Sequence, residues 1–426
     1  MHTSRTAPAA GAGLLATFIF LSSTFLITHD ANALSQWARK YKTSCFTCHT
    51  AFPRLNYYGE RFLWNGYQDP DNEQPDGDLM KKVINNELVL DDVTNLLGFR
   101  LNLTPFRLRE KALNLGGDEK DQITIGGPDW IQFFVGGSIF KNAAFFMELE
   151  FAGETVHYNW WHLSYHNMFG TPAVNFQLGN VSALEFSAQT DRLRIFPNYS
   201  SPLYAVKTSN GTGDDSLGIS QARPAIQYYG YAGPALWWAG VSSGKTAADV
   251  NDKMFYWGGL RYTVTEDMES AIEGSSVTLW AFQGEDGKNT AASDTVSASY
   301  LTSTSKRYQA AGNLRWRDID VIGSYVWGDD EDGKLSTSAN DKFEFKGYSF
   351  QAAWQINKMW YTGVMYDKVE KDTGSGFTVS DHQVIPQISF LPKENMRLGF
   401  YVKLDINDET GHTKKNDYWV NFRVMF

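Results

Sequence analysis

From about residue 96 to its end, the chain alternates apolar and polar residues in segments long enough to be β-strands. The last segment places Tyr418, Val420, Phe422, Val424 and Phe426 on one face and Trp419, Asn421 and Arg423 on the other. The segments near Met396 and Phe145 alternate in the same way. A soluble sandwich also alternates, but it seldom sustains about 330 residues of long aromatic-rich hairpins without a second core. The pattern therefore favours an all-β fold, a transmembrane barrel with an apolar outer face and a polar lumen.

The lengths of the connections agree with such a barrel, because outer-membrane barrels have short periplasmic turns and long outer loops. About sixteen antiparallel strands are predicted, near Phe99, Trp130, Ala143, Tyr158, Val174, Pro224, Ala235, Met254, Ser276, Arg307, Ile319, Phe345, Met359, His382, Met396 and Tyr418. Tight turns fall at Lys141-Asn142, Ala232-Gly233, Arg317-Asp318, Asn357 and Lys393-Glu394. Long connections fall at Arg109 to Pro128, Val181 to Arg223, Gly284 to Ser305, Gly328 to Lys342 and Asn407 to Asn416. An even count places both ends of the barrel on the periplasmic side. The connection from Val181 to Arg223 is long enough to hide another hairpin, and Pro386 interrupts one strand.

The first 33 residues read as a signal peptide that is removed. Arg5 supplies a positive charge, Leu14 to Ile27 is apolar, and Ala31-Asn32-Ala33 is a small-x-small cleavage pattern. The apolar run of about fourteen residues is shorter than the roughly 20 that a membrane-spanning helix needs. We therefore expect an exported chain that begins at Leu34.

Both cysteines of the chain lie in one pentapeptide, Cys45-Phe46-Thr47-Cys48-His49. This spacing lets two thioethers reach the vinyl groups of a haem while the adjacent histidine binds the iron. A structural disulfide, a thioredoxin-like redox pair and half of a zinc site are the other interpretations. A disulfide does not need His49, the redox motif expects a βαβ unit, and zinc needs more Cys or His nearby. The motif favours one covalently bound haem c with His49 as the proximal ligand.

The distal ligand of the haem iron has several candidates. Met80 is the only methionine between Leu34 and Asn95, and the rivals are His162 and His166, four residues apart on one strand. Methionine would raise the potential and histidine would lower it, and an open or water-bound iron is a further option.

Residues 34–95 form a small segment with six Pro or Gly residues, too short to bury a core alone. A single haem cannot conduct electrons across roughly 25 to 30 Å of hydrocarbon from outside the barrel. We therefore expect the segment to plug the lumen of the barrel at residues 96–426, and a periplasmic haem domain beside an open pore is the other arrangement.

The net charge of −10 argues against a nucleic-acid partner and leaves cations as plausible ligands. Acidic pairs and runs in the expected outer loops could attract hydrated metal cations, although acidic loops are common on such barrels. They are Asp214-Asp215, Glu285-Asp286 and Asp329-Asp330-Glu331-Asp332.

The export signal, the Cys45-x-x-Cys48-His49 motif, the expected strands and the C-terminal Phe426 together resemble the fused outer-membrane cytochrome-porins of iron-oxidising bacteria. The resemblance covers nearly the whole chain. It implies an iron:cytochrome c oxidoreductase that takes electrons from extracellular Fe(II) through one haem to a periplasmic c-type cytochrome, in contact with outer-membrane lipid. It also implies that Phe426 belongs to the signal for membrane insertion. Before the haem motif the chain departs from the family's usual Phe-Ala-Arg-Gln-Thr-Gly, with Trp37-Ala38-Arg39-Lys40-Tyr41-Lys42, and Ser35 replaces a usual proline.

Two further functions are compatible with the same residues. One is an electron conduit for another extracellular donor or acceptor, and the other is a diffusion porin with an accessory haem. Conductance separates the porin from a plugged barrel, and reduction by Fe(II) separates the two conduits.

Overall fold

The structure is a computed structural model of the whole chain. It describes residues 35–51, 53–70, 82–83, 89–90, 93–113, 119–140, 142–152, 155–190, 194–196, 201–206, 218–243, 254–265, 271–290, 299–331, 343–372, 377–409 and 412–426. The predicted signal peptide, the start at Leu34 and the candidate ligand Met80 lie outside these residues.

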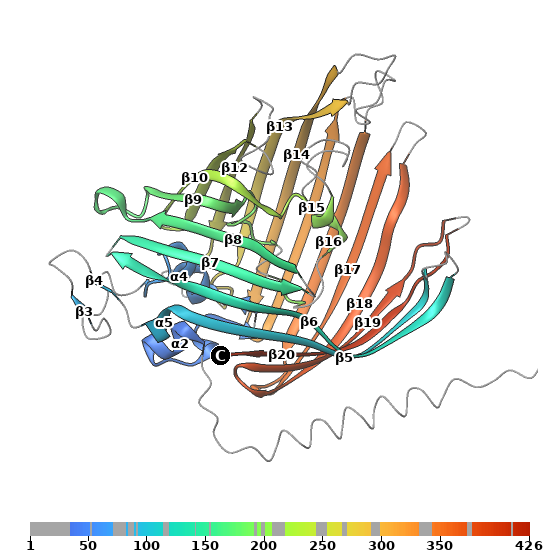
Figure 1. Cartoon of the computed structure of the whole chain (residues 1–426), viewed down its shortest axis with the longest axis horizontal. Coiled ribbons are helices and arrows are strands. Elements are labelled where there is room, and N and C mark those ends of the chain that lie inside the picture. The colour runs from blue at the N-terminus through green and yellow to red at the C-terminus, as the bar shows by residue number, and fades with distance from the viewer. Residues whose placement is uncertain are drawn as a thin grey trace, which may run out of the picture.

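Sixteen antiparallel strands close into one barrel, in which each strand pairs with its neighbours in the chain and β20 pairs with β5 (Figure 1). The strands are β5 (Leu97–Leu113), β6 (Glu119–Phe140), β7 (Ala143–Ala152), β8 (Thr155–Tyr165), β9 (Asn175–Ser182), β10 (Ala222–Ala232), β11 (Ala235–Ser242), β12 (Phe255–Thr263), β13 (Ser276–Thr290), β14 (Ser299–Trp316), β15 (Ile319–Asp330), β16 (Phe343–Gln355), β17 (Trp360–Asp372), β18 (Phe377–Lys393), β19 (Met396–Asp405) and β20 (Asp417–Met425). The predicted fold class and strand count are confirmed.

The strand boundaries differ from the prediction where strands extend past the apolar band. β5 continues to Leu113 and β6 already begins at Glu119, so the predicted connection from Arg109 to Pro128 is too long. Residues 120–126 of β6 are exposed on both faces, while backbone pairing with β5 continues. Pro386 lies inside β18, and the β18–β19 pairs pass from Val384–Leu404 to Gln387–Tyr401, which skips it. Proline has no N–H to donate to that ladder.

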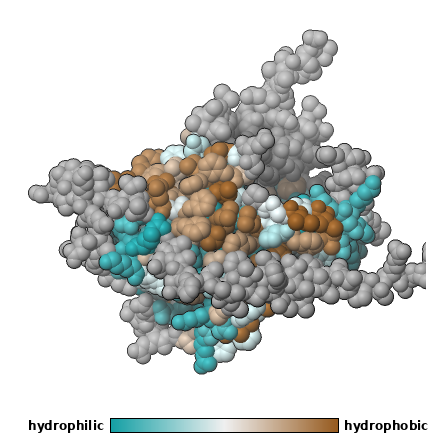
Figure 2. All heavy atoms as spheres, turned by 60° about the horizontal axis from the view of Figure 1, so that its bottom comes forward, coloured by the Kyte–Doolittle hydropathy of each residue, from teal (hydrophilic) through white to brown (hydrophobic). Residues whose placement is uncertain are grey.

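The two faces of the wall differ as the alternation predicts. Inward-facing side chains are buried and many are polar or charged, such as Gln227, Gln309 and Arg423. Outward-facing side chains are apolar and exposed, including Leu178, Leu260 and Leu279 among many others. Figure 2 shows hydrophobic residues gathered over the middle of one face, with hydrophilic patches beside them. Among the described residues, no helix has the length and apolar character that crossing a membrane requires.

The N-terminal segment folds into short elements. They are α2 (Gln36–Tyr41), α3 (Cys45–Cys48), β1 (His49–Ala51), β2 (Arg54–Leu55), α4 (Tyr57–Trp64), β3 (Lys82–Val83), β4 (Val89–Leu90) and α5 (Val93–Leu96). Asn56 begins α4 as its N-cap, because its side chain accepts a hydrogen bond from the Gly59 N–H at 2.9 Å.

Ion pairs join α4 and β2 to inward-facing side chains of the barrel. Arg54 Nε donates to Asp320 Oδ2 at 2.8 Å, and Arg315 Nη2 donates to Glu60 Oε1 at 2.9 Å. Arg261 also donates to Glu60, and the Arg54 and Glu60 side chains are fully buried. Because buried charges need partners, these contacts hold the N-terminal segment against β12, β14 and β15 inside the barrel.

The connection between β9 and β10 also lies against the inner wall. Ser187 Oγ donates to Gln309 Oε1 at 2.6 Å, and Ser201 Oγ donates to Asp367 Oδ1 at 2.6 Å. Its described residues include α6 (Pro202–Ala205), and Phe186 is buried in the same core as the N-terminal segment. No barrel strand occurs in the described part of this connection, so the additional hairpin considered from the sequence is not found there.

Candidate functional site

A cavity of about 760 Å³ lies between the N-terminal segment and the barrel wall. Cys45, Cys48 and His49 all line it. Its volume falls within the roughly 300–1,000 Å³ that is usual for small-molecule and cofactor sites. The fold therefore brings the three residues of the haem motif to one internal space of the size that a cofactor needs.

Hydrogen bonds to the barrel fix where the motif lies along its axis. Glu394, in the tight turn between β18 and β19, accepts hydrogen bonds from Ser44 Oγ at 2.6 Å and from the Cys45 N–H at 2.9 Å. At the same end, Arg39 Nη2 donates to the Leu97 carbonyl at 2.5 Å. The motif is thus held at the short-turn end of the barrel, where the C-terminus also lies (Figure 1).

Helix α4 packs closely on the motif. Asn56 Nδ2 donates to the Phe46 and Thr47 carbonyls at 3.1 and 2.9 Å, and the Asn56 N–H donates to the Cys48 carbonyl at 2.9 Å. A Cβ atom at Gly59 would lie 2.1 Å from the Cys48 carbonyl oxygen. Only glycine permits this approach of α4 to α3.

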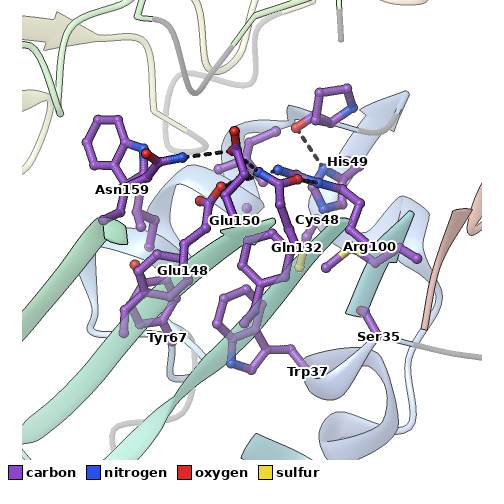
Figure 3. Close-up of a pocket in the computed structure, with 18 of the residues that line it drawn as sticks. Ser35, Trp37, Cys48, His49, Tyr67, Arg100, Gln132, Glu148, Glu150 and Asn159 are labelled. Carbon is purple, nitrogen blue, oxygen red and sulfur yellow. Dashed lines mark hydrogen bonds and ion pairs between the residues drawn. The ribbon is translucent and has the colours of Figure 1, made fainter. Parts of the chain in front are cut away.

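The imidazole of His49 is held by a contact of one ring nitrogen. Its Nδ1 lies 3.1 Å from the Pro53 carbonyl, the contact drawn beside His49 in Figure 3. When Nδ1 donates to that carbonyl, Nε2 carries the lone pair, and metal-bound histidines are usually held in this way. Burial lowers the pKa of His49 to about 4, against the opposing effect of the backbone contacts at Pro53 and Arg54, so the ring is neutral. A neutral imidazole is the form that binds a metal.

The two cysteines are separate thiols rather than a disulfide. Burial, followed by the charge of Glu394, raises the pKa of Cys45 to about 11. Burial, followed by Cys45 and Asp69, raises the pKa of Cys48 to about 12. Both thiols are therefore protonated at neutral pH, in contrast to reactive thiolates such as those of redox-active cysteine pairs.

Aromatic side chains form one side of the cavity. Trp37 stacks on Tyr67 with ring centroids 4.8 Å apart, and Tyr67 stacks on Phe146 at 5.3 Å. Phe62 and Phe134 also line the cavity. These rings provide the apolar surface that a porphyrin face needs, and the donor set and the lining together fit a haem c.

Polar side chains from β5, β6, β7 and β8 form another side, and Figure 3 shows them facing the space that His49 and Cys48 border. Gln132 Nε2 donates to Glu150 Oε2 at 3.0 Å, and Asn159 Nδ2 donates to the same oxygen at 2.8 Å. Arg100 Nη2 lies 3.6 Å from Glu148 Oε1.

The predicted distal ligands His162 and His166 do not line this cavity. His162 lies behind Tyr67 and Phe146, at ring centroid distances of 6.2 and 5.8 Å. His166 packs on Gly66, where φ is +65° and a Cβ atom would lie 2.4 Å from the imidazole. Both histidines thus pack around the N-terminal segment, outside the cavity that His49 borders.

Two other candidate donors line the cavity and were missed from the sequence, His157 and Met425. Met425 is buried, and its N–H donates to the carbonyl of Asn395, next to Glu394, at 3.0 Å. The alternation of the last strand could have placed Met425 inside the barrel, since it shares the inward face with Arg423. His157 is exposed and lies 2.9 Å from Thr155 Oγ1.

Within the residues that the structure describes, no group of three or more His, Cys, Asp or Glu side chains could hold a metal ion. Of the acidic residues predicted on outer loops, Asp330 is fully buried and pairs with Arg307 at 2.7 Å, so it is not a surface ligand. Asp214-Asp215 lies outside the described residues.

Comparison with known proteins gives the fold of the barrel. No protein-family model and no curated protein sequence matches the chain. Among solved structures, it is similar to OmpT, an outer membrane protein of Vibrio cholerae, at 13% identity and a TM-score of 0.52, over 80% of this chain and 99% of that one. An anion-selective porin from Comamonas acidovorans matches at 12% identity and a TM-score of 0.54, over 78% of this chain and 98% of that one. Salmonella typhi OmpF in complex with daunomycin matches at 10% identity and a TM-score of 0.53, over 81% of this chain and 100% of that one. The barrel thus has a porin-like fold.

Proposed function

We propose that this chain is an outer-membrane electron-transfer protein that holds one haem c inside its barrel. It takes electrons from extracellular Fe(II) and delivers them to a periplasmic c-type cytochrome. The observation that carries the proposal is the position of Cys45, Cys48 and His49, which line one cavity inside a porin-like barrel. The donor and the acceptor follow the resemblance to cytochrome-porins.

The membrane assignment is supported by the wall of the barrel. Exposed apolar side chains cover its outer face while polar side chains line its inner face, the pattern of a barrel in lipid. The predicted signal peptide and the porin-like fold agree with an exported protein of the outer membrane. The outer-membrane lipid is therefore one partner of the chain.

The N-terminal segment acts as a plug in this proposal. Its contacts reach several parts of the wall, through Glu60 to β12 and β14, through Arg54 to β15 and through the Trp64 carbonyl to Tyr229 of β10 at 2.8 Å. The connection between β9 and β10 occupies the lumen beside it. Two segments in one lumen leave little room for solutes, which favours transfer of charge over diffusion of molecules.

The residues of the cavity have distinct roles. Cys45 and Cys48 would tether the cofactor through thioethers, and His49 would bind its iron. A bound haem c supplies a one-electron Fe(III)/Fe(II) couple. Phe62, Trp37 and Tyr67 exclude water from it, and exclusion of water raises the potential of a haem.

For a second protein ligand of the iron, Met80 remains a prediction, and Met425 is a further candidate because it lines the cavity. We place Met425 first because it lines the cavity and because its N–H is bonded to Asn395, the residue next to Glu394, which holds Cys45. Methionine opposite histidine would raise the potential, as an acceptor of electrons from Fe(II) requires.

One hydrophobic core extends from the cavity, where it includes Phe62 and Phe146, toward the outer loops. Tyr229 stacks on Phe186 at 4.6 Å, and Phe186 contacts Trp238 at 6.0 Å. The same core continues to Phe255 and Phe345, at the long-loop ends of β12 and β16. In the proposal, Fe(II) loses one electron at the outer face, the electron passes inward through this core, and Fe(III) stays outside.

Outer-sphere transfer needs no dedicated iron site. The test is to add Fe(II) to the detergent-purified holoprotein and to record the α-band of reduced c-haem. We expect the band to appear. A haem that dithionite reduces and Fe(II) does not would reject the Fe(II) reaction and favour a conduit for another donor. A diffusion porin with an accessory haem would instead give high ionic conductance in planar bilayers.

A further inference from the structure

We propose that three arginines, Arg423, Arg100 and Arg194, hold the two propionate carboxylates of the haem against the seam between β20 and β5. This inference rests on the proposed haem and adds residues that the haem motif does not contain. All three side chains line the cavity that Cys45, Cys48 and His49 border. We refer to them as the arginine cluster.

The register of the barrel places two members of the arginine cluster side by side. Met425 pairs with Arg100 and Arg423 pairs with Asn102 across the β20–β5 seam, so Arg100 and Arg423 are diagonal neighbours on the inward face. Diagonal neighbours in an antiparallel pair are roughly 7–8 Å apart at Cα, within reach for long side chains. Arg194 joins them from the connection between β9 and β10.

The charges of the arginine cluster act on one another. Arg423 lies close enough to Arg100 and Arg194 for their charges to interact, and Arg423 is 1% exposed. Three guanidiniums that border one cavity repel one another, and an anionic ligand on that side relieves the repulsion. Three carboxylates also border the cavity. Glu148 lies 3.6 Å from Arg100 Nη2, Gln132 and Asn159 donate to Glu150, and Ser44 and Cys45 donate to Glu394.

A haem c has the matching chemistry, because it carries two carboxylates on one edge. Arginine is suited to such groups, since its planar guanidinium donates two parallel hydrogen bonds to a carboxylate. Arg100 also lies over the Phe134 ring at 4.8 Å, which fixes its position beside the apolar lining. The cavity thus has a sulfur side, an imidazole and a cationic side, as an oriented haem requires.

Strand β19 provides a matched control. Arg397 pairs directly with Arg423 across β19 and β20, and both are 1% exposed. Arg397 does not line the cavity and donates instead to Gln387 Oε1 at 2.9 Å and to Ser389 Oγ at 3.1 Å. Replacing either arginine by glutamine removes one buried charge, but only Arg423→Gln removes it from the cavity.

The experiment measures the midpoint potential of the purified holoprotein by spectroelectrochemistry. A guanidinium beside the propionates favours the reduced haem, so Arg423→Gln should lower the potential relative to wild type and to Arg397→Gln. Arg423→Lys, which keeps the charge, should have a midpoint potential close to that of wild type. Should Arg423→Gln fail to fold, Arg100→Gln against Arg397→Gln gives the same comparison.

Equal potentials in Arg423→Gln, Arg397→Gln and wild type would overturn the assignment while leaving the haem in place. A wild-type potential that follows the phosphate concentration would show that the arginine cluster binds a soluble anion, and this also overturns it. Absence of haem from the wild-type protein is a different result, because it rejects the proposed function itself.

Discussion

Arg315 Nη2 donates a hydrogen bond to Glu60 Oε1 at 2.9 Å and so joins β14 of the barrel wall to helix α4 in the lumen. The same carboxylate accepts from Arg261 of β12, and Arg54 beside it reaches Asp320 of β15. The N-terminal segment is therefore fixed to β12 and β14 through Glu60 and to β15 through Arg54. This relationship has consequences for stability and for the cofactor.

Glu60→Gln should destabilise the folded barrel strongly. The substitution keeps the shape but leaves the buried guanidiniums of Arg54, Arg261 and Arg315 without their shared anion. Loss of one partner from a buried ion pair costs about 3–5 kcal/mol of unfolding free energy. Heat-dependent mobility on denaturing gels measures the change, and Glu331→Gln, at the exposed pair with Lys306, should leave it unaltered.

The stability should also fall in acid through Glu60. Burial disfavours the charged carboxylate, but Arg261, Arg315 and Arg54 outweigh it and hold the pKa of Glu60 below its ordinary value. Its contribution to stability is therefore present above the unfolded value of about 4.3 and is lost as the pH falls through the lower folded value. Unfolding temperatures recorded in this acid range should decline less for Glu60→Gln than for wild type. An equal decline in both proteins would assign the acid sensitivity to other groups.

Gly59→Ala should reduce the yield of holoprotein more than the yield of barrel. The added methyl would meet the Cys48 carbonyl oxygen at 2.1 Å and push α4 away from α3. The ratio of haem absorbance to total protein measures this effect. Gly323→Ala is a suitable control because a Cβ atom there meets nothing within 4 Å. An unchanged ratio in Gly59→Ala would show that the packing of α4 does not matter for the cofactor.

Met425→Leu should abolish the near-infrared charge-transfer band of methionine-ligated ferric haem and lower the midpoint potential. Leucine fills similar space in the core without a sulfur donor. Met80→Leu is the comparison, since Met80 was the methionine favoured by its position in the sequence. Loss of the band in Met80→Leu alone would show that the earlier candidate is the ligand and that Met425 only packs.

The sequence predicted the barrel well because one physical rule governs every strand. A wall between lipid and a filled lumen requires side chains to alternate, so the inward Trp419, Asn421 and Arg423 could be separated from their outward neighbours by inspection. The tight turns at Arg317-Asp318 and Lys393-Glu394 are also where the structure has them.

The contents of the lumen were harder to predict, because they depend on contacts between distant residues. Glu60 and Arg315 are 255 positions apart, and nothing local marks them as partners. The connection from Val181 to Arg223 gave no periodic signal, since Ser187 and Ser201 are held by individual hydrogen bonds to the wall. His162 was considered a ligand because histidine binds iron, whereas its position behind Tyr67 follows from the packing of the N-terminal segment.

The central claim is that one haem c is bound through Cys45, Cys48 and His49 inside the barrel. Its most direct test is the pyridine haemochrome of the detergent-purified protein, expressed with its export signal in a host that attaches c-type haem. We predict one haem per chain with two thioether links, and none retained after denaturation in the Cys45→Ala, Cys48→Ala double variant. A folded wild-type barrel with no haemochrome signature would contradict the claim.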